Sequence, residues 1–93
     1  MKHLNLKIHG KVQMVFFRDC TKKKADKLGL FGWVRNNDDK TVSVSVEGDE
    51  KKLKEFFEWC QQGPSLARVE KIDEDWNREI RGFKGFEITR GIF

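Results

Sequence analysis

Apolar residues recur at two different spacings along this chain of 93 residues, and the order of the two spacings constrains the fold. Residues 2–9 and 41–48 alternate apolar and polar side chains, which is typical of half-buried strands. Residues 18–28 and 50–62 carry apolar side chains three or four positions apart, as amphipathic helices do. Shorter apolar patterns predict three further strands, at residues 30–36, 67–72 and 85–89.

The predicted order is β-α-β-β-α-β with a short extra strand at the C-terminal end. This order is typical of the α+β class and of a ferredoxin-like split βαβ sandwich, in which two helices pack on one face of an antiparallel sheet. Right-handed crossovers leave few other topologies for such a chain. We expect Trp33, Trp59 and Trp76 to pack in or beside the core, with Trp76 in a polar connection before the last strand.

Composition and charge limit the possible partners. Apolar residues make up 38% of the chain, enough for one compact core, so we expect residues 1–93 to form a single domain. The 19 basic and 15 acidic residues give a net charge of +4, which favours anionic ligands without forming a basic nucleic-acid tract. No apolar run approaches the ~18 residues of a membrane span, and the alternating N-terminus differs from a signal peptide. We therefore expect a cytoplasmic protein with no membrane partner.

The two cysteines are too few for a disulfide framework and lack a CxxC spacing. Reduced thiols are the simplest expectation for a cytoplasmic protein. Cys20 begins the first predicted helix and Cys60 ends the second, so antiparallel helices would place both toward the same end of the molecule. A disulfide between them remains an open alternative, because the sequence does not give the distance between their Cα atoms.

The stretch GKVQMVFFR, residues 10–18, joins the first predicted strand to the first predicted helix. The first N–H groups of a helix have no helical partner and lie at the positive end of its dipole, so an anion can bind there. Arg18 adds a forked cation suited to two phosphate oxygens, and Gly10 allows a tight turn at the loop entrance. We expect Phe16 and Phe17 to anchor this loop to the core. The alternative is an ordinary surface loop with a solvated arginine.

Several other chemistries lack the residues that they need. The loop has no paired cysteines for metal transfer, and Cys20 follows Arg18, whereas a cysteine phosphatase needs its thiolate ahead of the arginine. The strand at 41–48 presents serines instead of the aromatic residues of an RNA-binding sheet. His3 and His9 flank the first strand and are expected to be exposed, and no acidic or histidine cluster has metal-ligand spacing.

Two stretches, GKVQMVFFR (10–18) and GWVRNNDDKTVSVSVEG (32–48), resemble the two signature motifs of the acylphosphatases. The resemblance continues through GPSLARVEKI and the terminal GFEI, and so covers nearly the whole chain. It implies a ferredoxin-like fold and hydrolysis of the carboxyl–phosphate bond of small acyl phosphates. It also implies no metal, no organic cofactor and no covalent intermediate, with inorganic phosphate or sulfate as bound anions. A monomer without a nucleic-acid partner is expected.

The resemblance also assigns roles to individual residues. Arg18 falls on the motif arginine that holds the phosphate, and Asn36 falls on the motif asparagine that orients the attacking water. Backbone N–H groups of the loop complete the phosphate site, and the residues concerned are Lys11, Val12, Gln13, Met14, Val15 and Phe16. Acyl phosphates are already activated, so positioning and charge stabilisation suffice for catalysis. Without the motif, a turn-forming role beside Asn37 would be the preferred interpretation of Asn36.

The chain departs from the family pattern at two positions. Met14 and Lys40 each stand where the motifs usually have glycine. If the backbone at Met14 needs a positive φ, methionine strains it; if the position only needs space, the side chain crowds the substrate. The alternative function is therefore an anion-binding module that keeps the loop but has little turnover. A nucleic-acid-binding βαββαβ domain is a third, weaker hypothesis.

Overall fold

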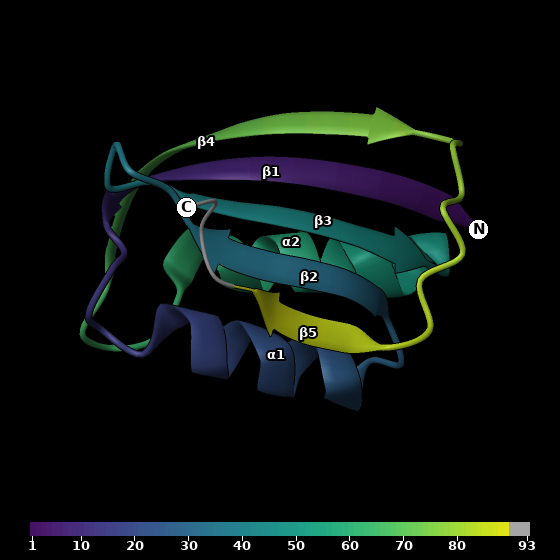
Figure 1. Cartoon of the computed structure of the whole chain (residues 1–93), viewed down its shortest axis with the longest axis horizontal. Coiled ribbons are helices and arrows are strands. Elements are labelled where there is room, and N and C mark those ends of the chain that lie inside the picture. Colours follow the sequence, from purple (N-terminus) through teal and green to yellow (C-terminus); the bar gives the residue numbers. More distant parts are fainter. Residues whose placement is uncertain (90–93) are drawn as a thin grey trace.

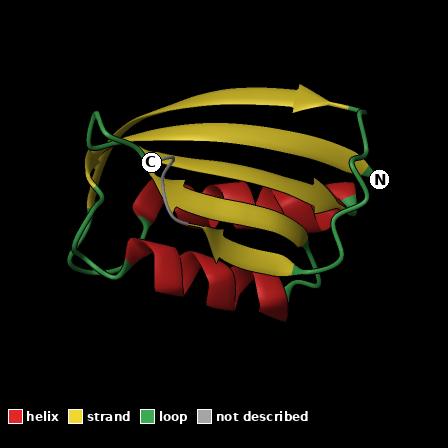
Figure 2. Cartoon of the chain, in the orientation of Figure 1, coloured by secondary structure: helices red, strands yellow, loops and turns green. Residues whose placement is uncertain are grey.

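The computed structural model describes residues 1–89 of the chain. Its helices and strands are β1 (Lys2–Lys11), α1 (Phe17–Lys27), β2 (Phe31–Asn36), β3 (Val42–Gly48), α2 (Glu50–Gln62), β4 (Arg68–Asn77) and β5 (Phe86–Thr89). Both helices lie on the same face of the sheet, as Figures 1 and 2 show. This arrangement confirms the ferredoxin-like α+β fold predicted from the order of the elements.

The five strands lie in the order β4-β1-β3-β2-β5. The first four pair antiparallel as predicted, whereas β5 pairs parallel to β2, so the sheet is mixed instead of antiparallel throughout. The reason is the path of the chain: β4 lies on one edge and β5 on the other, and residues 78–85 cross the end of the sheet between them (Figure 1). The chain reverses direction in this connection, so β5 runs the same way as β2.

The core lies between the sheet and the two helices, and its strand residues follow the predicted alternation. In the pairing of β1 with β3, Leu4 lies opposite Val46 and Leu6 opposite Val44, and all four side chains are buried. The buried helix residues are Phe17, Thr21 and Ala25 on α1 and Leu53, Phe56 and Cys60 on α2. Burial of these side chains supplies the main driving force for folding.

The helix α2 begins and ends at residues that favour a helix start and a helix end. The Asp49 side chain caps the helix and accepts hydrogen bonds from the N–H groups of Lys51 and Lys52. At the other end Gly63 has a φ of 67°, and a Cβ there would lie 2.7 Å from the ring of Phe17. Glycine is therefore needed both for the left-handed backbone and for close approach to α1.

Two of the three tryptophans, Trp59 and Trp76, pack against the core as predicted. Trp76 belongs to β4, opposite Leu4 of β1, so its predicted place in a polar connection is wrong. Its ring packs edge-on against Phe57 with centroids 6.0 Å apart, and strand pairing extends β4 despite the polar residues around it. Trp33 instead lies on the sheet face away from the helices, where the guanidinium of Arg35 is 4.9 Å from the centroid of its ring.

The prediction of an exposed His3 is wrong, because the connection at 78–85 covers it. His3 is fully buried, and its Nδ1 lies 3.2 Å from a carboxylate oxygen of Glu47, which is also buried. That carboxylate accepts the backbone N–H groups of Arg81, Gly82 and Phe83. Burial alone would raise the pKa of Glu47, but the hydrogen bonds from Arg81, His3 and the other two N–H groups lower it.

Both cysteines are free thiols in the structure. Cys60 is buried in the core, and burial raises the pKa of its thiol, which keeps the group neutral. Within residues 1–89, no helix has the length and apolar character needed to cross a membrane.

Candidate active site

The end of β1 that leads into the loop before α1 contains a β-bulge. The pairing of β1 with β4 shifts between His9 and Gly10, where the strand leaves its regular register. Gly10 has a φ of 127°, and a Cβ at this position would lie 2.1 Å from the carbonyl oxygen of Arg68. No other residue fits this contact, so Gly10 fixes the entrance of the loop as the sequence predicts.

Inside the loop, buried and exposed side chains alternate in a way that the sequence analysis missed. Val12, Val15 and Phe17 are buried and hold the loop against the core. Met14 is 99% exposed and Phe16 is 67% exposed. The prediction that Phe17 anchors the loop is confirmed, and the same prediction for Phe16 is wrong, because its backbone turns the side chain outward.

The two exposed residues have left-handed backbones, with a φ of 61° at Met14 and 63° at Phe16. A non-glycine residue in this region costs roughly 1–2 kcal/mol. The sequence analysis left two possible effects of Met14, strain in its backbone or crowding of the substrate by its side chain. The positive φ supports the first, backbone strain. Such strain collects at functional sites, where the surrounding fold holds the backbone in place.

Sharp turns of this kind bring successive N–H groups to one concave side of a chain, where an anion can bind. Within the part of the chain that the structure describes, the N–H groups of residues 13–17 have no hydrogen-bond acceptor in the protein. Residue 17 begins α1, so the positive end of the helix dipole lies at the same place. The loop therefore presents hydrogen-bond donors together with a favourable field for an anion.

Arg18 is the second residue of α1 and is half-buried. Its guanidinium forms no ion pair with a carboxylate of residues 1–89. It lines a pocket of about 360 Å³ together with Val12, Met14, Phe16, Phe17, Asp19 and Asn36. The structure thus brings together the two side chains that the motifs single out, although they lie 18 positions apart in the sequence.

Asn36 is the last residue of β2 and pairs with Val42, on the side of the sheet that faces the helices. Its Oδ1 is buried and has no hydrogen-bond partner among residues 1–89. A buried polar atom without a partner is rare in folded proteins and calls for an explanation. The side chain amide can donate and accept, so a water molecule or a ligand in the pocket could satisfy it.

Gln13 has a role that the sequence analysis did not identify. Its Nε2 donates to the carbonyl oxygens of Asn37, at 2.8 Å, and of Thr41, at 3.0 Å. The Asn37 side chain in turn donates to the hydroxyls of Thr41 and Ser43. These bonds tie the loop to the turn that follows Asn36 and so fix the position of Asn36 relative to Arg18. The sequence feature that could have indicated this role is the polar Gln13 between Val12 and Val15, the two valines that anchor the loop.

The turn between β2 and β3 contains the second departure from the family pattern. Lys40 has a φ of 73°, which is a left-handed backbone conformation. The glycine usual at this position in the family motif can adopt this conformation without strain. Hydrogen bonds from Thr41 and from Lys7 hold the pKa of the Asp39 carboxyl well below its usual range. These contacts stabilise the turn through residues that do not line the pocket.

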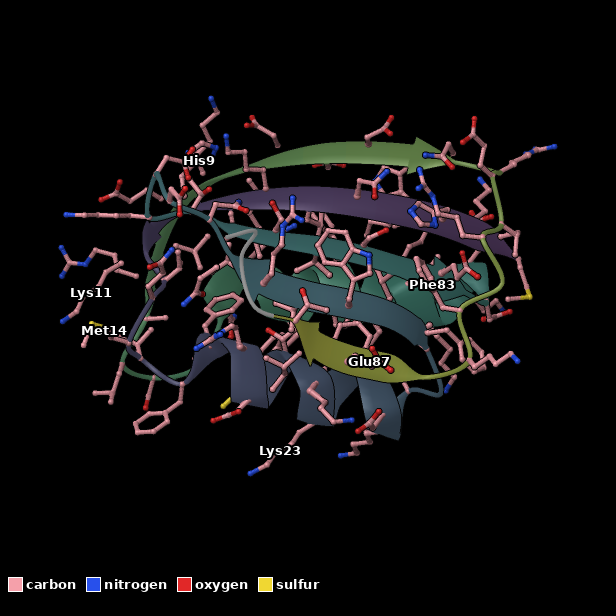
Figure 3. All side chains as sticks on the ribbon, in the orientation of Figure 1. His9, Lys11, Met14, Lys23, Phe83 and Glu87 are labelled. Atoms are coloured by element: carbon pink, nitrogen blue, oxygen red, sulfur yellow. The ribbon has the colours of Figure 1, made fainter. Side chains whose placement is uncertain are left out.

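The remaining loop residues of the predicted site contribute no side chain to the pocket. Lys11 is exposed at the end of β1, Gln13 faces the turn and Val15 is in the core. Figure 3 shows Lys11 and Met14 at one end of the molecule and Phe83 at the other. Among the predicted phosphate-binding residues, the side chains that line the pocket are those of Val12, Met14, Phe16 and Arg18. Within residues 1–89, no three carboxylate, thiol or imidazole groups lie close enough together to hold a metal ion.

Comparisons with known proteins agree with this geometry. The family model for acylphosphatase matches residues 4–88. The chain is 43% identical over 85 residues to an acylphosphatase from Thermococcus kodakarensis, covering 91% of this chain and 92% of the relative. It is 42% identical over 92 residues to one from Methylococcus capsulatus, covering 99% and 100%.

A similar structure is also known. The crystal structure of acylphosphatase from Bacillus subtilis superimposes with a TM-score of 0.93 at 35% identity, covering 96% of this chain and 99% of that one. Sequence and structure therefore agree over almost the full length of the compared chains. This chain belongs to the acylphosphatase family of hydrolases.

Proposed function

We propose that the protein hydrolyses acyl phosphates to a carboxylate and inorganic phosphate by direct attack of water. The observation that carries this proposal is one pocket that contains Arg18, Asn36 and a loop whose N–H groups have no acceptor in the protein. The family supplies the substrate class, and the positions of these groups suggest how the reaction proceeds.

The phosphate binds to the loop. Its oxygens accept hydrogen bonds from the N–H groups of the 11–18 loop, while the Arg18 guanidinium holds two of them at once. Because the donors are fixed by a folded loop, they need little rearrangement as charge shifts in the transition state. Inorganic phosphate and sulfate have the same tetrahedral oxygens and bind in the same place.

Asn36 orients the attacking water. Its Oδ1, which has no partner among the described residues, accepts a hydrogen bond from the water and points the water oxygen at phosphorus. The new P–O bond forms as the bond to the acyl oxygen breaks, and the carboxylate leaves with the electron pair. The water's proton passes to a phosphate oxygen. No strong base is required, since a carboxylate is a good leaving group.

The remaining features of the proposal follow from this mechanism. Every step uses only Arg18, Asn36 and backbone N–H groups, so the reaction needs no metal ion and no organic cofactor. We also propose that the protein acts as a monomer, because one copy of the chain supplies Arg18, Asn36 and the loop, and that it is cytoplasmic, where its two free thiols stay reduced.

The second candidate is an anion-binding module whose turnover is lost because of Met14. The strained backbone at Met14 favours this candidate, but the side chain is 99% exposed and leaves room for the phosphate. Turnover therefore remains the better-supported function.

Hydrolysis of benzoyl phosphate in excess EDTA distinguishes the two candidates. We expect turnover in EDTA and competitive inhibition by inorganic phosphate. Phosphate binding without turnover would support the binding module. Activity that disappears on chelation and returns with a divalent ion would refute the metal-free mechanism.

A further inference from the structure

We propose that Met14 and Phe16 form an apolar lip that makes the enzyme select acyl phosphates with a neutral, extended apolar acyl group. This inference rests on the proposed function and concerns the part of the substrate that lies beyond the phosphate. The apolar lip is defined as the two side chains of Met14 and Phe16, both of which line the pocket that contains Arg18 and Asn36.

The exposure of the two side chains is the first observation. Met14 and Phe16 are among the few large apolar residues of the described chain that are mainly exposed. Contact with water costs apolar side chains free energy in proportion to their area, which an apolar ligand would recover. Val12, which precedes the lip residues, and Val15, which lies between them, are buried, so the loop has an inward and an outward side.

The backbone conformation is the second observation. Both lip residues have left-handed φ values, where glycine or asparagine would be more stable. The conformation turns both side chains outward beside the N–H groups that bind the phosphate. A bound phosphate at the loop therefore leaves its acyl group close to the lip, where the pocket opens to solvent.

The size and charge of the pocket narrow the substrate class. Its volume of about 360 Å³ is within the range of roughly 300–1,000 Å³ for small-molecule sites and exceeds the needs of phosphate alone. Two charged side chains line it: Arg18, which the proposed mechanism assigns to the phosphate, and the acidic Asp19. This carboxylate would repel an acyl group that carries a second negative charge. The lip and Asp19 together favour a neutral, apolar acyl group.

Acetyl, butyryl and hexanoyl phosphate test the inference, since their carboxylate leaving groups are of nearly equal acidity. We expect kcat/KM of the wild-type protein to rise roughly tenfold or more from acetyl to hexanoyl phosphate, mainly through a lower KM. In Met14→Gln and in Phe16→Asn, the hexanoyl-to-acetyl ratio should fall roughly three- to tenfold. The ratio compares two substrates of the same variant. A change in phosphate binding that affects both substrates equally therefore cancels.

Two matched controls separate the lip from general changes in polarity. Met14→Leu keeps an apolar side chain on the same backbone and should keep the wild-type ratio. Ile80→Gln removes an exposed apolar side chain in the 78–85 connection, at the other end of the sheet, and should also leave the ratio unchanged. Phe16→Asn suits the left-handed backbone, so at least one lip variant is expected to fold normally.

The outcomes are distinct. A wild-type ratio near one, or a ratio that neither lip variant changes in a folded protein, would overturn the apolar lip while leaving the acylphosphatase activity intact. No hydrolysis of any of the three substrates by the wild-type protein would overturn the proposed function and the lip together.

Discussion

The two ends of the sheet differ in what their backbone N–H groups contact. At one end, residues 81–83 donate three backbone N–H groups to the carboxylate of Glu47, which is an anion of the protein itself. At the other end, the N–H groups of residues 13–17 have no acceptor within the described chain, and Arg18 and several residues of this loop line a pocket. Figure 1 shows the two loops at opposite ends of the molecule. Backbone donors therefore stabilise the fold at one end, and in the proposed mechanism the same kind of donors bind the substrate phosphate at the other.

The two loops also differ in how they meet the need for left-handed backbone. The 81–83 loop has a glycine at its left-handed position, Gly82, with a φ of 74°. The 13–17 loop has Met14 and Phe16 at φ values of 61° and 63°. The structural loop thus avoids strain, whereas the loop at the pocket retains strain and exposes two apolar side chains. Four predictions test this comparison.

Removal of the Arg18 guanidinium should have the largest effect. We expect Arg18→Ala to lower kcat/KM for benzoyl phosphate by roughly 10²–10³-fold, because the cation fixing the phosphate is lost. Arg18→Lys should also lose most activity, since an ammonium cannot form two parallel bonds. Arg81→Ala is the matched control, because that residue supplies only its backbone N–H to Glu47. A lysine variant with near wild-type kinetics would contradict the two-point contact with phosphate.

Asn36→Ala should separate turnover from binding. We expect kcat to fall by roughly 10²-fold while inhibition by inorganic phosphate changes little, because Asn36 contacts the water in the proposed mechanism. Asn77→Ala, in β4 and outside the pocket, should leave both quantities unchanged. Steady-state kinetics with phosphate as inhibitor measures both. A parallel loss of phosphate binding would place Asn36 in the phosphate site or in the fold.

Glu47→Gln should lower stability with little effect on catalysis. Loss of the charge weakens three N–H bonds and the contact with His3, so we expect the free energy of unfolding at pH 7 to fall by about 1–3 kcal/mol. The lowered pKa of Glu47 sets the pH dependence. The stability that the ionised Glu47 carboxylate adds is fully present above the unfolded-state pKa of roughly 4.3. It is lost as the pH falls through the lower pKa of the folded state.

Denaturant unfolding of both proteins from pH 7 to pH 3 tests this prediction. The difference between wild type and variant should shrink as the solution becomes more acidic. A constant difference would mean that the charge of Glu47 contributes nothing to the 81–83 loop. A large loss of kcat at pH 7 would show that the two ends of the sheet are coupled.

Much of the fold, and two residues of the candidate site, could be predicted from local sequence. The alternation in β1 and β3 and the cap at Asp49 act over a few residues, and the motifs single out Arg18 and Asn36. What the sequence analysis missed depends on distant parts of the chain. His3 is buried because residues 81–83 cover it, and the outward side chain of Phe16 follows from a backbone angle.

Met14→Gly introduces glycine at a left-handed position of one loop, and Gly82→Ala removes glycine from such a position in the other. The effects of these two changes should be the smallest. Glycine at Met14 removes strain of roughly 1 kcal/mol but adds unfolded-chain entropy of ~0.4–1 kcal/mol, so stability should change little. Alanine at Gly82 meets no atom within 4 Å, so its left-handed φ of 74° alone should lower stability by about 1 kcal/mol.

Activity distinguishes the two loops more clearly than stability does. If methionine reduces the fraction of the free loop in the left-handed conformation, glycine should tighten phosphate binding or raise kcat/KM for acetyl phosphate, by roughly two- to fivefold. Acetyl phosphate is the proper substrate here, because its short acyl group makes little use of the apolar lip. Gly82→Ala should leave these kinetics unchanged, since Gly82 donates its N–H to Glu47 at the end of the sheet away from the pocket. Unchanged or poorer kinetics in a folded Met14→Gly protein would mean that the loop is already held in its binding conformation, so that strain at Met14 affects stability alone.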